Sequence, residues 1–289
     1  SWDESKDRKT VTLHLAEDAK FHDGQPVTAE DVAFSLGVVK REHPFGANLF
    51  GPVTSVDTPD EQTVVINMSR RHPALMTAMS PPFLPVMPEH VYGTDDTVAD
   101  HPQNAQDVVG SGPYELSSHL EGKRIVLSKV DGFFMPNEEA PKQVLMEIIS
   151  DENTLALATE KGEIDMMLSN TPSILSRMKA VDGVTVADKG YEGLGALTWL
   201  GFNVKSENVS DKRVRQAIAY AIDRDYLVNK LHRGQMDPAT SPIANGSPYL
   251  DDSLPRYDRD LDKAADLLDE AGHQIDEHGN RFTVQLDYD

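Results

Sequence analysis

Short segments of strand-type and helix-type pattern alternate along this chain, and that alternation restricts its fold more than any other feature. Residues 11–15 alternate apolar and polar side chains as a half-buried strand does, residues 63–68 form a second strand-type run, and residues 144–149 form an apolar run typical of a buried strand. Further strands are predicted over residues 124–130, 164–168, 185–189, 197–204 and 282–286. With helices between the strands, the order favours an α/β fold with mixed α+β sheets over a helical bundle or a β-sandwich.

The helix boundaries carry their own signals. Thr28 and Asp31 have the spacing of an N-cap and a near capping box, and the helix that follows should stop at His43-Pro44. Gly272 stands where a helix C′ residue is expected. Turns are predicted at residues 59–60 and 121–122, the second of them closing a hairpin. The remaining helices are predicted over residues 153–161, 172–178, 211–231 and 262–271.

Composition sets limits on partners and chemistry. The 289 residues include 27 Lys+Arg against 48 Asp+Glu, a formal charge of −21, which argues strongly against nucleic acid or an anionic membrane as the main partner. A hydrophobic fraction of 39% fits a folded chain, and the length suggests two compact units. The absence of cysteine excludes disulfides, thiolate metal sites and cysteine nucleophiles.

No segment carries a recognised catalytic or metal-binding pattern. The 10 histidines show no His-Glu-x-x-His spacing, and no nucleophile elbow, P-loop or dinucleotide fingerprint is present. His22-Asp23 could be a general base with its orienting acid, but a turn is favoured because neighbouring residues on a strand point to opposite faces. The pattern predicts no catalytic residue, no metal ligand and no cofactor.

Three local features allow both a structural and a functional interpretation. Trp199 is either a core aromatic or one wall of a ligand cleft, at about even odds. Residues 169–171 follow a predicted strand, where ligand contacts often lie, although a turn and helix cap is favoured on pattern alone. Arg213, Arg215 and Arg224 lie beside acidic residues on one predicted helix, so a salt-bridged solvent face is favoured over an anion site.

Residues 21–32, Phe-His-Asp-Gly-Gln-Pro-Val-Thr-Ala-Glu-Asp-Val, closely resemble a segment of the large solute-binding proteins that serve dipeptide and oligopeptide ABC importers, the extracellular family 5 group. Four later segments resemble family motifs in the family's order, and together the five make the resemblance specific. These segments are residues 108–114, 161–165, 213–224 and 263–272. The family's Asn before Tyr-Trp is replaced by residues 131–134, Asp-Gly-Phe-Phe, so that contact surface is expected to differ.

The resemblance implies a periplasmic-binding-protein-like, two-lobe class II architecture that is only partly present. Residues 1–109 resemble the extra subdomain of lobe one, residues 110–203 part of its main sheet, and residues 204–289 the beginning of lobe two. The start of lobe one and most of lobe two are expected to lie outside these residues, and no signal segment is seen. The resemblance further implies a periplasmic or extracellular location, with a lipid anchor as one option.

The function implied by the resemblance is non-enzymatic. A monomer would capture a small peptide between hinged lobes and deliver it to the permease subunits of the importer, with nickel, a sugar or an opine as alternative ligands. A carboxylate-based hydrolase is the alternative of another class. The matched cleft-facing positions are Leu168, Ser169, Asn170, Thr198 and Trp199. The Asp that anchors the peptide amino group in this family is expected outside this sequence, so the site would be half formed and its affinity weak.

Overall fold

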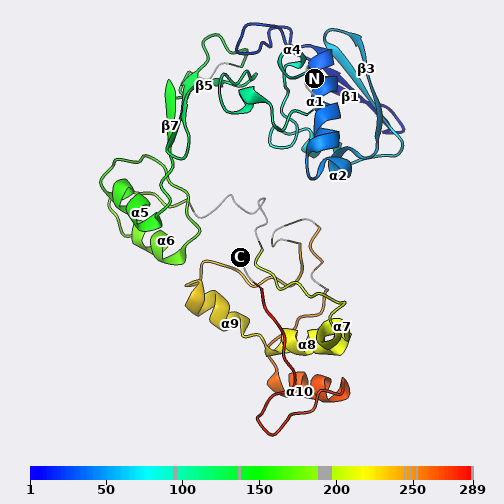
Figure 1. Cartoon of the computed structure of the whole chain (residues 1–289), viewed down its shortest axis with the longest axis vertical. Coiled ribbons are helices and arrows are strands. Elements are labelled where there is room, and N and C mark those ends of the chain that lie inside the picture. The colour runs from blue at the N-terminus through cyan, green and yellow to red at the C-terminus, as the bar shows by residue number, and fades with distance from the viewer. Residues whose placement is uncertain are drawn as a thin grey trace. The chain divides into compact units, whose positions relative to one another are not determined.

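The computed structural model describes residues 1–93, 97–135, 138–187, 197–243, 245, 247, 249–251 and 253–287. The chain forms two compact units, Ser1–Ile149 and Ser150–Asp289, each with its own packing (Figure 1). We call them unit 1 and unit 2. The assignment of residues 1–109, 110–203 and 204–289 to parts of two lobes stays a prediction.

Unit 1 begins with a four-stranded antiparallel sheet whose strand order is β1-β2-β4-β3. The predicted strands at residues 11–15 and 63–68 are confirmed, but two strands were missed and the turn lies at residues 61–62 rather than 59–60. The longer missed strand, β3, is exposed at most positions and therefore lacks an apolar alternation. The strands are β1 (Trp2–Glu4), β2 (Thr10–His14), β3 (Val53–Asp60) and β4 (Thr63–Met68).

Helix α1 (Ala29–Glu42) starts at the capping box that the sequence predicts. The Thr28 Oγ1 accepts the Asp31 N–H at 3.4 Å, and the Asp31 Oδ2 accepts the Thr28 N–H at 2.8 Å. The other carboxylate oxygen, Oδ1, accepts the N–H of Glu89 at 2.9 Å, at the start of α4 (Glu89–Tyr92). Asp31 is buried, so its carboxylate joins the beginnings of two helices inside the protein.

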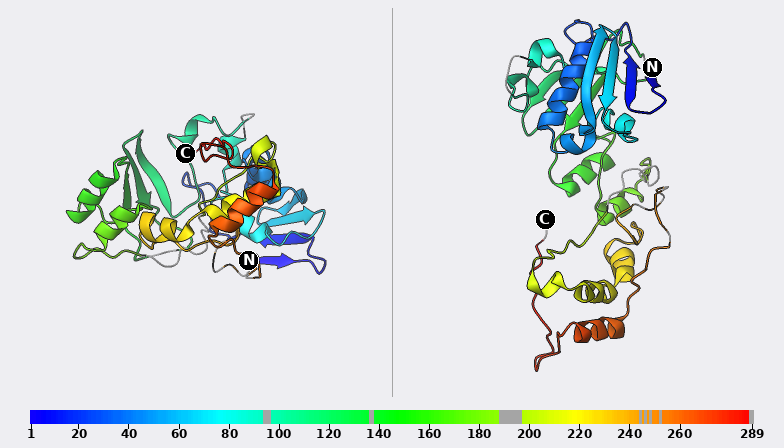
Figure 2. Two further views of the ribbon diagram at one scale, coloured as in Figure 1. Left: turned by 90° about the horizontal axis from the view of Figure 1, so that it is seen from below. Right: turned by 90° about the vertical axis from the view of Figure 1, so that its right-hand side faces the viewer.

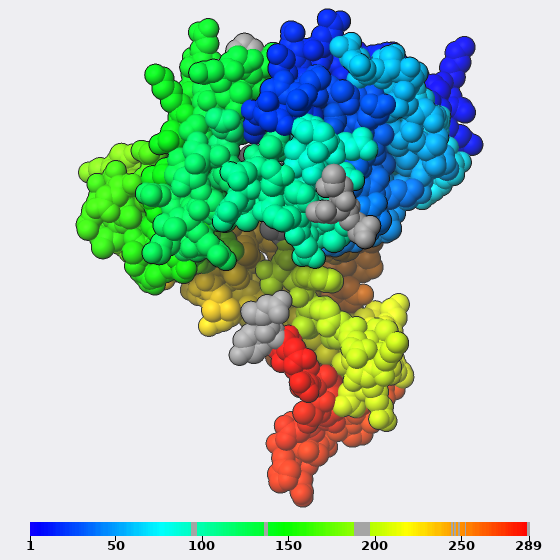
Figure 3. Space-filling model, turned by 45° about the horizontal axis from the view of Figure 1, so that its top comes forward, coloured from blue at the N-terminus to red at the C-terminus, as the bar shows by residue number. Residues whose placement is uncertain are grey.

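Helix α1 lies along the sheet (Figure 2), and its apolar side chains belong to the main core of unit 1. Leu36 is 2% exposed, and Ile66 on β4 and Phe50 are fully buried. On the face that Figure 3 shows, the outer atoms of this part of the chain, coloured blue to cyan, form one continuous surface. Short helices complete the core: α2 (Gly46–Phe50) and α3 (Leu75–Ala78).

A second antiparallel sheet of unit 1 has the order β5-β6-β7. Its hairpin, β5 (Tyr114–Leu120) with β6 (Arg124–Lys129), confirms the predicted hairpin and its turn at residues 121–122. The third strand, β7 (Gln143–Glu147), lies within the predicted run at residues 144–149 apart from its first residue. A 3-10 turn, η1 (Pro102–Asn104), precedes this sheet.

The described part of unit 2 consists of helices and irregular segments, without a strand. The predicted helices at residues 153–161, 172–178 and 262–271 are confirmed, and Gly272 has the left-handed φ of 87° that a C′ residue needs. The helices are α5 (Glu152–Glu160), α6 (Pro172–Met178), α7 (Glu207–Ser210), α8 (Lys212–Ala221), α9 (Arg224–Tyr226), the π-helical turn η3 (Leu227–Leu231) and α10 (Leu261–Glu270).

The strands predicted for unit 2 at residues 164–168, 197–204 and 282–286 are wrong. These segments are rich in apolar side chains, as strands are, and residues 282–286 also alternate apolar and polar side chains. However, no described segment pairs with them, and a strand without a ladder leaves its backbone groups to water. Residues of these segments are accordingly exposed to solvent, Met166 by 82% and Leu286 by 67%. Of the predicted strand at residues 185–189, the last two residues lie outside the described residues and the first three form no strand.

The single helix predicted over residues 211–231 is interrupted at Ile222, whose ψ of 126° is extended. Asp223 provides the reason, because its Oδ1 accepts the N–H of Tyr226 at 2.8 Å and so starts the next helix, α9. Aspartate favours such a cap over a position inside a helix. The apolar spacing continues through the break, which is why periodicity alone did not show it.

None of the helices in the described residues is both long enough and apolar enough to cross a membrane.

We expect Leu36→Ala to lower the free energy of unfolding of unit 1 by about 2–5 kcal/mol, because it removes a buried side chain and leaves a cavity between α1 and the sheet. The measurement is hydrogen exchange of the β2 and β4 amides. Leu120→Ala is the matched control, since Leu120 is 49% exposed, and it should change exchange little. Equal effects of the two substitutions would contradict this description of the core.

Candidate functional site

Helices α5 and α6 form the part of unit 2 that holds the first group of predicted site residues. They pack through Ala156, Ile174 and Met178, which form a small buried cluster. The Arg177 guanidinium makes a bidentate ion pair with Glu160, at 2.6 and 2.7 Å, and its hydrogen bonds lower the pKa of that carboxyl. The pair fixes the second helix on the first.

The segment between these helices turns alternate side chains inward and outward. Met167 packs against the buried cluster, and the Thr159 hydroxyl lies 3.2 Å from its Sδ. Met166 and Leu168, on either side, are 82% and 79% exposed. Leu168 is therefore held at a fixed place by its inward neighbour while its own side chain faces away from the cluster.

Ser169 organises the start of α6. Its hydroxyl donates to the Glu152 Oε1 at 3.3 Å, and its Oγ accepts the N–H of Thr171 at 3.1 Å. The turn interpretation of residues 169–171 is thus confirmed, although Ser169 supplies the contact and the Thr171 side chain makes no cap hydrogen bond. Asn170, the central residue of this turn, is exposed and its side chain makes no hydrogen bond to the described residues.

Thr198 and Trp199 form the second predicted group. Both are exposed, and Trp199 is 84% exposed, which rules out its interpretation as a core aromatic within the described residues. The segment before them, residues 188–196, lies outside the described residues. The interpretation of Trp199 as the wall of a cleft stays a prediction.

The structure brings Leu168, Ser169 and Asn170 together on one turn, and it joins them to Thr198 and Trp199 by no hydrogen bond or ring contact within the described ranges. Sequence reasoning missed Glu152, which holds the Ser169 hydroxyl. Glu152 begins α5, 17 residues before Ser169, and no local pattern connects the two positions. Among the residues described, no cluster of three or more His, Cys, Asp or Glu side chains could hold a metal ion.

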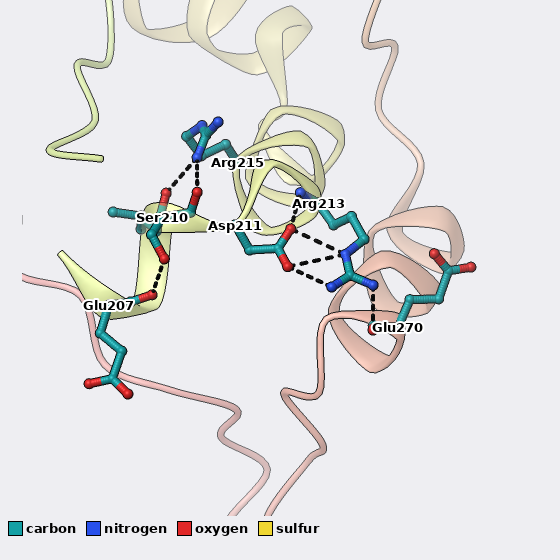
Figure 4. A network of polar contacts seen from close by, with 7 residues as sticks. Glu207, Ser210, Asp211, Arg213, Arg215 and Glu270 are labelled. Atoms are coloured by element: carbon teal, nitrogen blue, oxygen red, sulfur yellow. Dashed lines mark hydrogen bonds and ion pairs between the residues drawn. The ribbon is translucent and has the colours of Figure 1, made fainter. Parts of the chain in front are cut away.

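The three arginines of the 213–224 motif bind backbone carbonyls. Arg213 donates to the carbonyl of Glu270 at 2.7 Å, at the end of α10, and also pairs with Asp211 (Figure 4). Arg215 donates to the carbonyls of Val209 and Ser210 at 2.8 and 2.7 Å. In this way the first two arginines hold α10 and α7 against α8.

Arg224 follows the same rule, donating to the carbonyls of Ala219 and Tyr257 at 3.0 and 2.6 Å. Among the described residues, the favoured prediction of a salt-bridged face is confirmed for Arg213, whose partner is Asp211 at 2.6 Å, and not for the other two arginines. All three guanidinium groups donate hydrogen bonds to backbone carbonyls, so the motif holds helices together. The interpretation of these arginines as an anion site therefore loses its support.

We expect Arg213→Gln to raise the pKa of Asp211 toward its ordinary value of 3.8, because hydrogen bonds from Arg213 lower that pKa to about 2. Since the folded pKa is depressed, ionised Asp211 stabilises the fold above about pH 3.8, and this contribution is lost as the pH falls through about 2. Carboxyl carbon shifts followed against pH measure it. Arg215→Gln is the control and should move the pKa much less, and a pKa unchanged by Arg213→Gln would contradict the assignment.

Comparison with known proteins places this geometry in a family. The family profile described as "Bacterial extracellular solute-binding proteins, family 5 Middle" matches residues 1–289. The dipeptide-binding protein of Escherichia coli K12 is 25% identical over 291 residues, covering 94% of this chain and 54% of that relative. The chain thus spans about half the length of the relatives that it matches.

Two solved structures are similar in fold and bind different solutes. NikZ of Campylobacter jejuni in complex with Ni(L-His) superposes with a TM-score of 0.80 at 25% identity, covering 97% of this chain and 55% of that one. AgaA of A. tumefaciens in complex with agropinic acid gives a TM-score of 0.75 at 27% identity, covering 94% and 54%. The fold expected from the sequence, that of part of a periplasmic binding protein, is confirmed. This chain belongs to family 5 of the bacterial extracellular solute-binding proteins.

Proposed function

We propose that this chain is part of the solute-binding component of an ABC importer, which captures a small peptide outside the cytoplasmic membrane and delivers it to permease subunits. The observation that carries the proposal is the family match along the whole chain. The dipeptide-binding relative from E. coli supports a peptide as the leading ligand class. Capture needs no catalytic group, in keeping with a sequence that nominates none.

The proposed ligand contacts are Leu168, Ser169, Asn170, Thr198 and Trp199. All of them except Ser169 are exposed, which supports this proposal, since an apolar surface as large as the Trp199 side chain, 84% exposed, is available to another molecule. Asn170 offers a donor and an acceptor that the described residues do not use. A peptide backbone presents matching N–H and C=O groups, and an indole ring can cover its side chains.

Other ligand classes remain as specific alternatives, because the solved relatives bind Ni(L-His) and agropinic acid. The five proposed contact residues are all uncharged, which suits the neutral backbone of a peptide better than a charged opine or metal complex. A carboxylate-based hydrolase has no supporting observation, since none of the proposed contacts is a carboxylic acid.

Because the chain spans about half of its relatives, we expect weak binding by these residues alone. An association with few contacts must still offset the loss of translational and rotational freedom. The affinity of the chain for a short peptide should therefore lie in the millimolar range, on the order of 1 mM. The proposal concerns which residues touch the ligand, and that can be tested at low affinity.

We expect a peptide mixture to change the fluorescence emission of Trp199 in a Trp2→Phe variant. The sequence has two tryptophans, so Trp199 is the only one left in this variant. Fluorescence titration gives the dissociation constant. Asn170→Ala should weaken binding by about threefold to tenfold, because a hydrogen bond of Asn170 to the peptide backbone would be lost. Ser117→Ala, in β5 of unit 1, is the control and should leave the titration unchanged.

Two results would overturn this proposal. An emission spectrum that stays constant at millimolar peptide would show that Trp199 does not contact the ligand. Equal weakening by Asn170→Ala and by Ser117→Ala would show that the segment at residues 168–170 has no specific role in binding. A response to Ni(L-His) or to an opine, in the absence of one to peptides, would move the proposal to that ligand class.

A further inference from the structure

The histidine of the first family motif joins two segments of unit 1 that lie far apart in sequence. The backbone N–H of His22 donates to the carbonyl of Gly110 at 2.8 Å. On its side chain, the Nδ1 accepts the N–H of Gly110 at 3.2 Å, and the Nε2 lies 3.1 Å from the carbonyl oxygen of Gly112. Three hydrogen bonds thus connect the loop at residues 21–25 with residues 110–112, which lead into β5.

The two ring contacts require one form of the imidazole. The Gly110 N–H can only donate, so the Nδ1 that accepts it carries no proton. The Gly112 carbonyl can only accept, so the Nε2 that faces it carries the proton. An imidazolium would place two N–H groups opposite each other at Nδ1. The neutral ring with its proton on Nε2 is therefore the form that fits both partners.

Gly110 is adapted to the ring as well as to the hydrogen bonds. A Cβ added at this position would lie 3.1 Å from the His22 Cε1 and 3.6 Å from its Nδ1, which is a tight contact. At Gly112, two residues later, a Cβ would meet only the carbonyl oxygen of Tyr114 at 3.8 Å. The absence of a side chain at residue 110 lets the backbone come close to the imidazole.

The carboxylate next to His22 has a different partner. Asp23 pairs with His90 of α4 at 2.7 Å, and the Phe21 ring meets the same His90 edge-on, with ring centroids 5.9 Å apart. Asp23 also accepts the N–H of Gln25 at 3.0 Å, which closes the turn. Asp23 therefore does not orient His22 as a general base, and the turn interpretation of His22-Asp23 is confirmed.

We propose that one tautomer of His22, the neutral ring protonated on Nε2, holds residues 110–112, and with them the start of β5, against the loop at residues 21–25. In this form the ring can make both hydrogen bonds, from the Gly110 N–H and to the Gly112 carbonyl. His22 acts here as a positioning residue within the fold, so the proposal does not depend on which solute the protein binds.

The tautomer is measured directly on the unaltered chain by long-range proton–nitrogen correlation NMR at neutral pH. We expect a nitrogen shift typical of an unprotonated ring nitrogen at Nδ1 and of a protonated one at Nε2. A spectrum of His22 with the proton on Nδ1, or with both nitrogens protonated, would overturn the proposal. This readout needs no variant and so does not depend on the folding of one.

Substitutions separate the two ring contacts. The side-chain oxygen of asparagine can take the place of Nδ1, whereas the amide nitrogen of glutamine can take the place of Nε2. Protection of the Gly110 amide from hydrogen exchange should fall about tenfold in His22→Ala and His22→Gln, and should be largely restored in His22→Asn. Equal protection in the asparagine and glutamine variants would contradict the assigned geometry.

The fit of Gly110 to the ring is tested by a double-mutant cycle. Gly110→Ala should lower the thermal midpoint, and Gly112→Ala, its matched control, should change it little. In the His22→Ala background the effect of Gly110→Ala should be smaller, because the ring that the new methyl group meets is gone. An equal effect in both backgrounds would show that Gly110 does not contact His22 in the way proposed.

Discussion

The packing of α1 against the first sheet is the interaction on which unit 1 depends. A four-stranded antiparallel sheet with one apolar face cannot stay folded unless that face is covered, and Val32, Leu36 and Val39 of α1 cover it. Asp31 joins the start of this helix to α4, and His22 joins the preceding loop to residues 110–112. The polar contacts thus position the parts around a core that supplies most of the stability.

Much of the fold could be predicted where the signal lies in neighbouring residues. Thr28 and Asp31 predict their capping box because cap, helix and hydrogen bonds all lie within one turn. By contrast, residues 164–168 and 282–286 have the pattern of strands but no described partner, and pairing is a property of two segments. Strand β3 was missed for the opposite reason: β4 pairs with it, but its mostly exposed side chains give no apolar alternation in the sequence.

The positions of the candidate site come from the family resemblance, and their role in binding a ligand stays a prediction. The family resemblance pointed to residues 168–170 and 198–199, and the structure shows that Leu168 and Trp199 are largely exposed. It could not reveal that Glu152 holds the Ser169 hydroxyl, because that contact depends on how α5 and α6 pack. The exposure of Trp199 likewise depends on tertiary structure, because the sequence alone favoured neither a core position nor a cleft wall for this side chain.

The most direct test of the central claim, that this chain carries part of a peptide-binding site, is saturation-transfer NMR observed on the ligand. This method detects weak binding, which suits a chain that spans about half of its relatives. We predict transfer to the protons of short peptides, with a clear loss in Trp199→Ala. Transfer to peptides that is the same in Trp199→Ala, or transfer to an opine but to no peptide, would contradict the account.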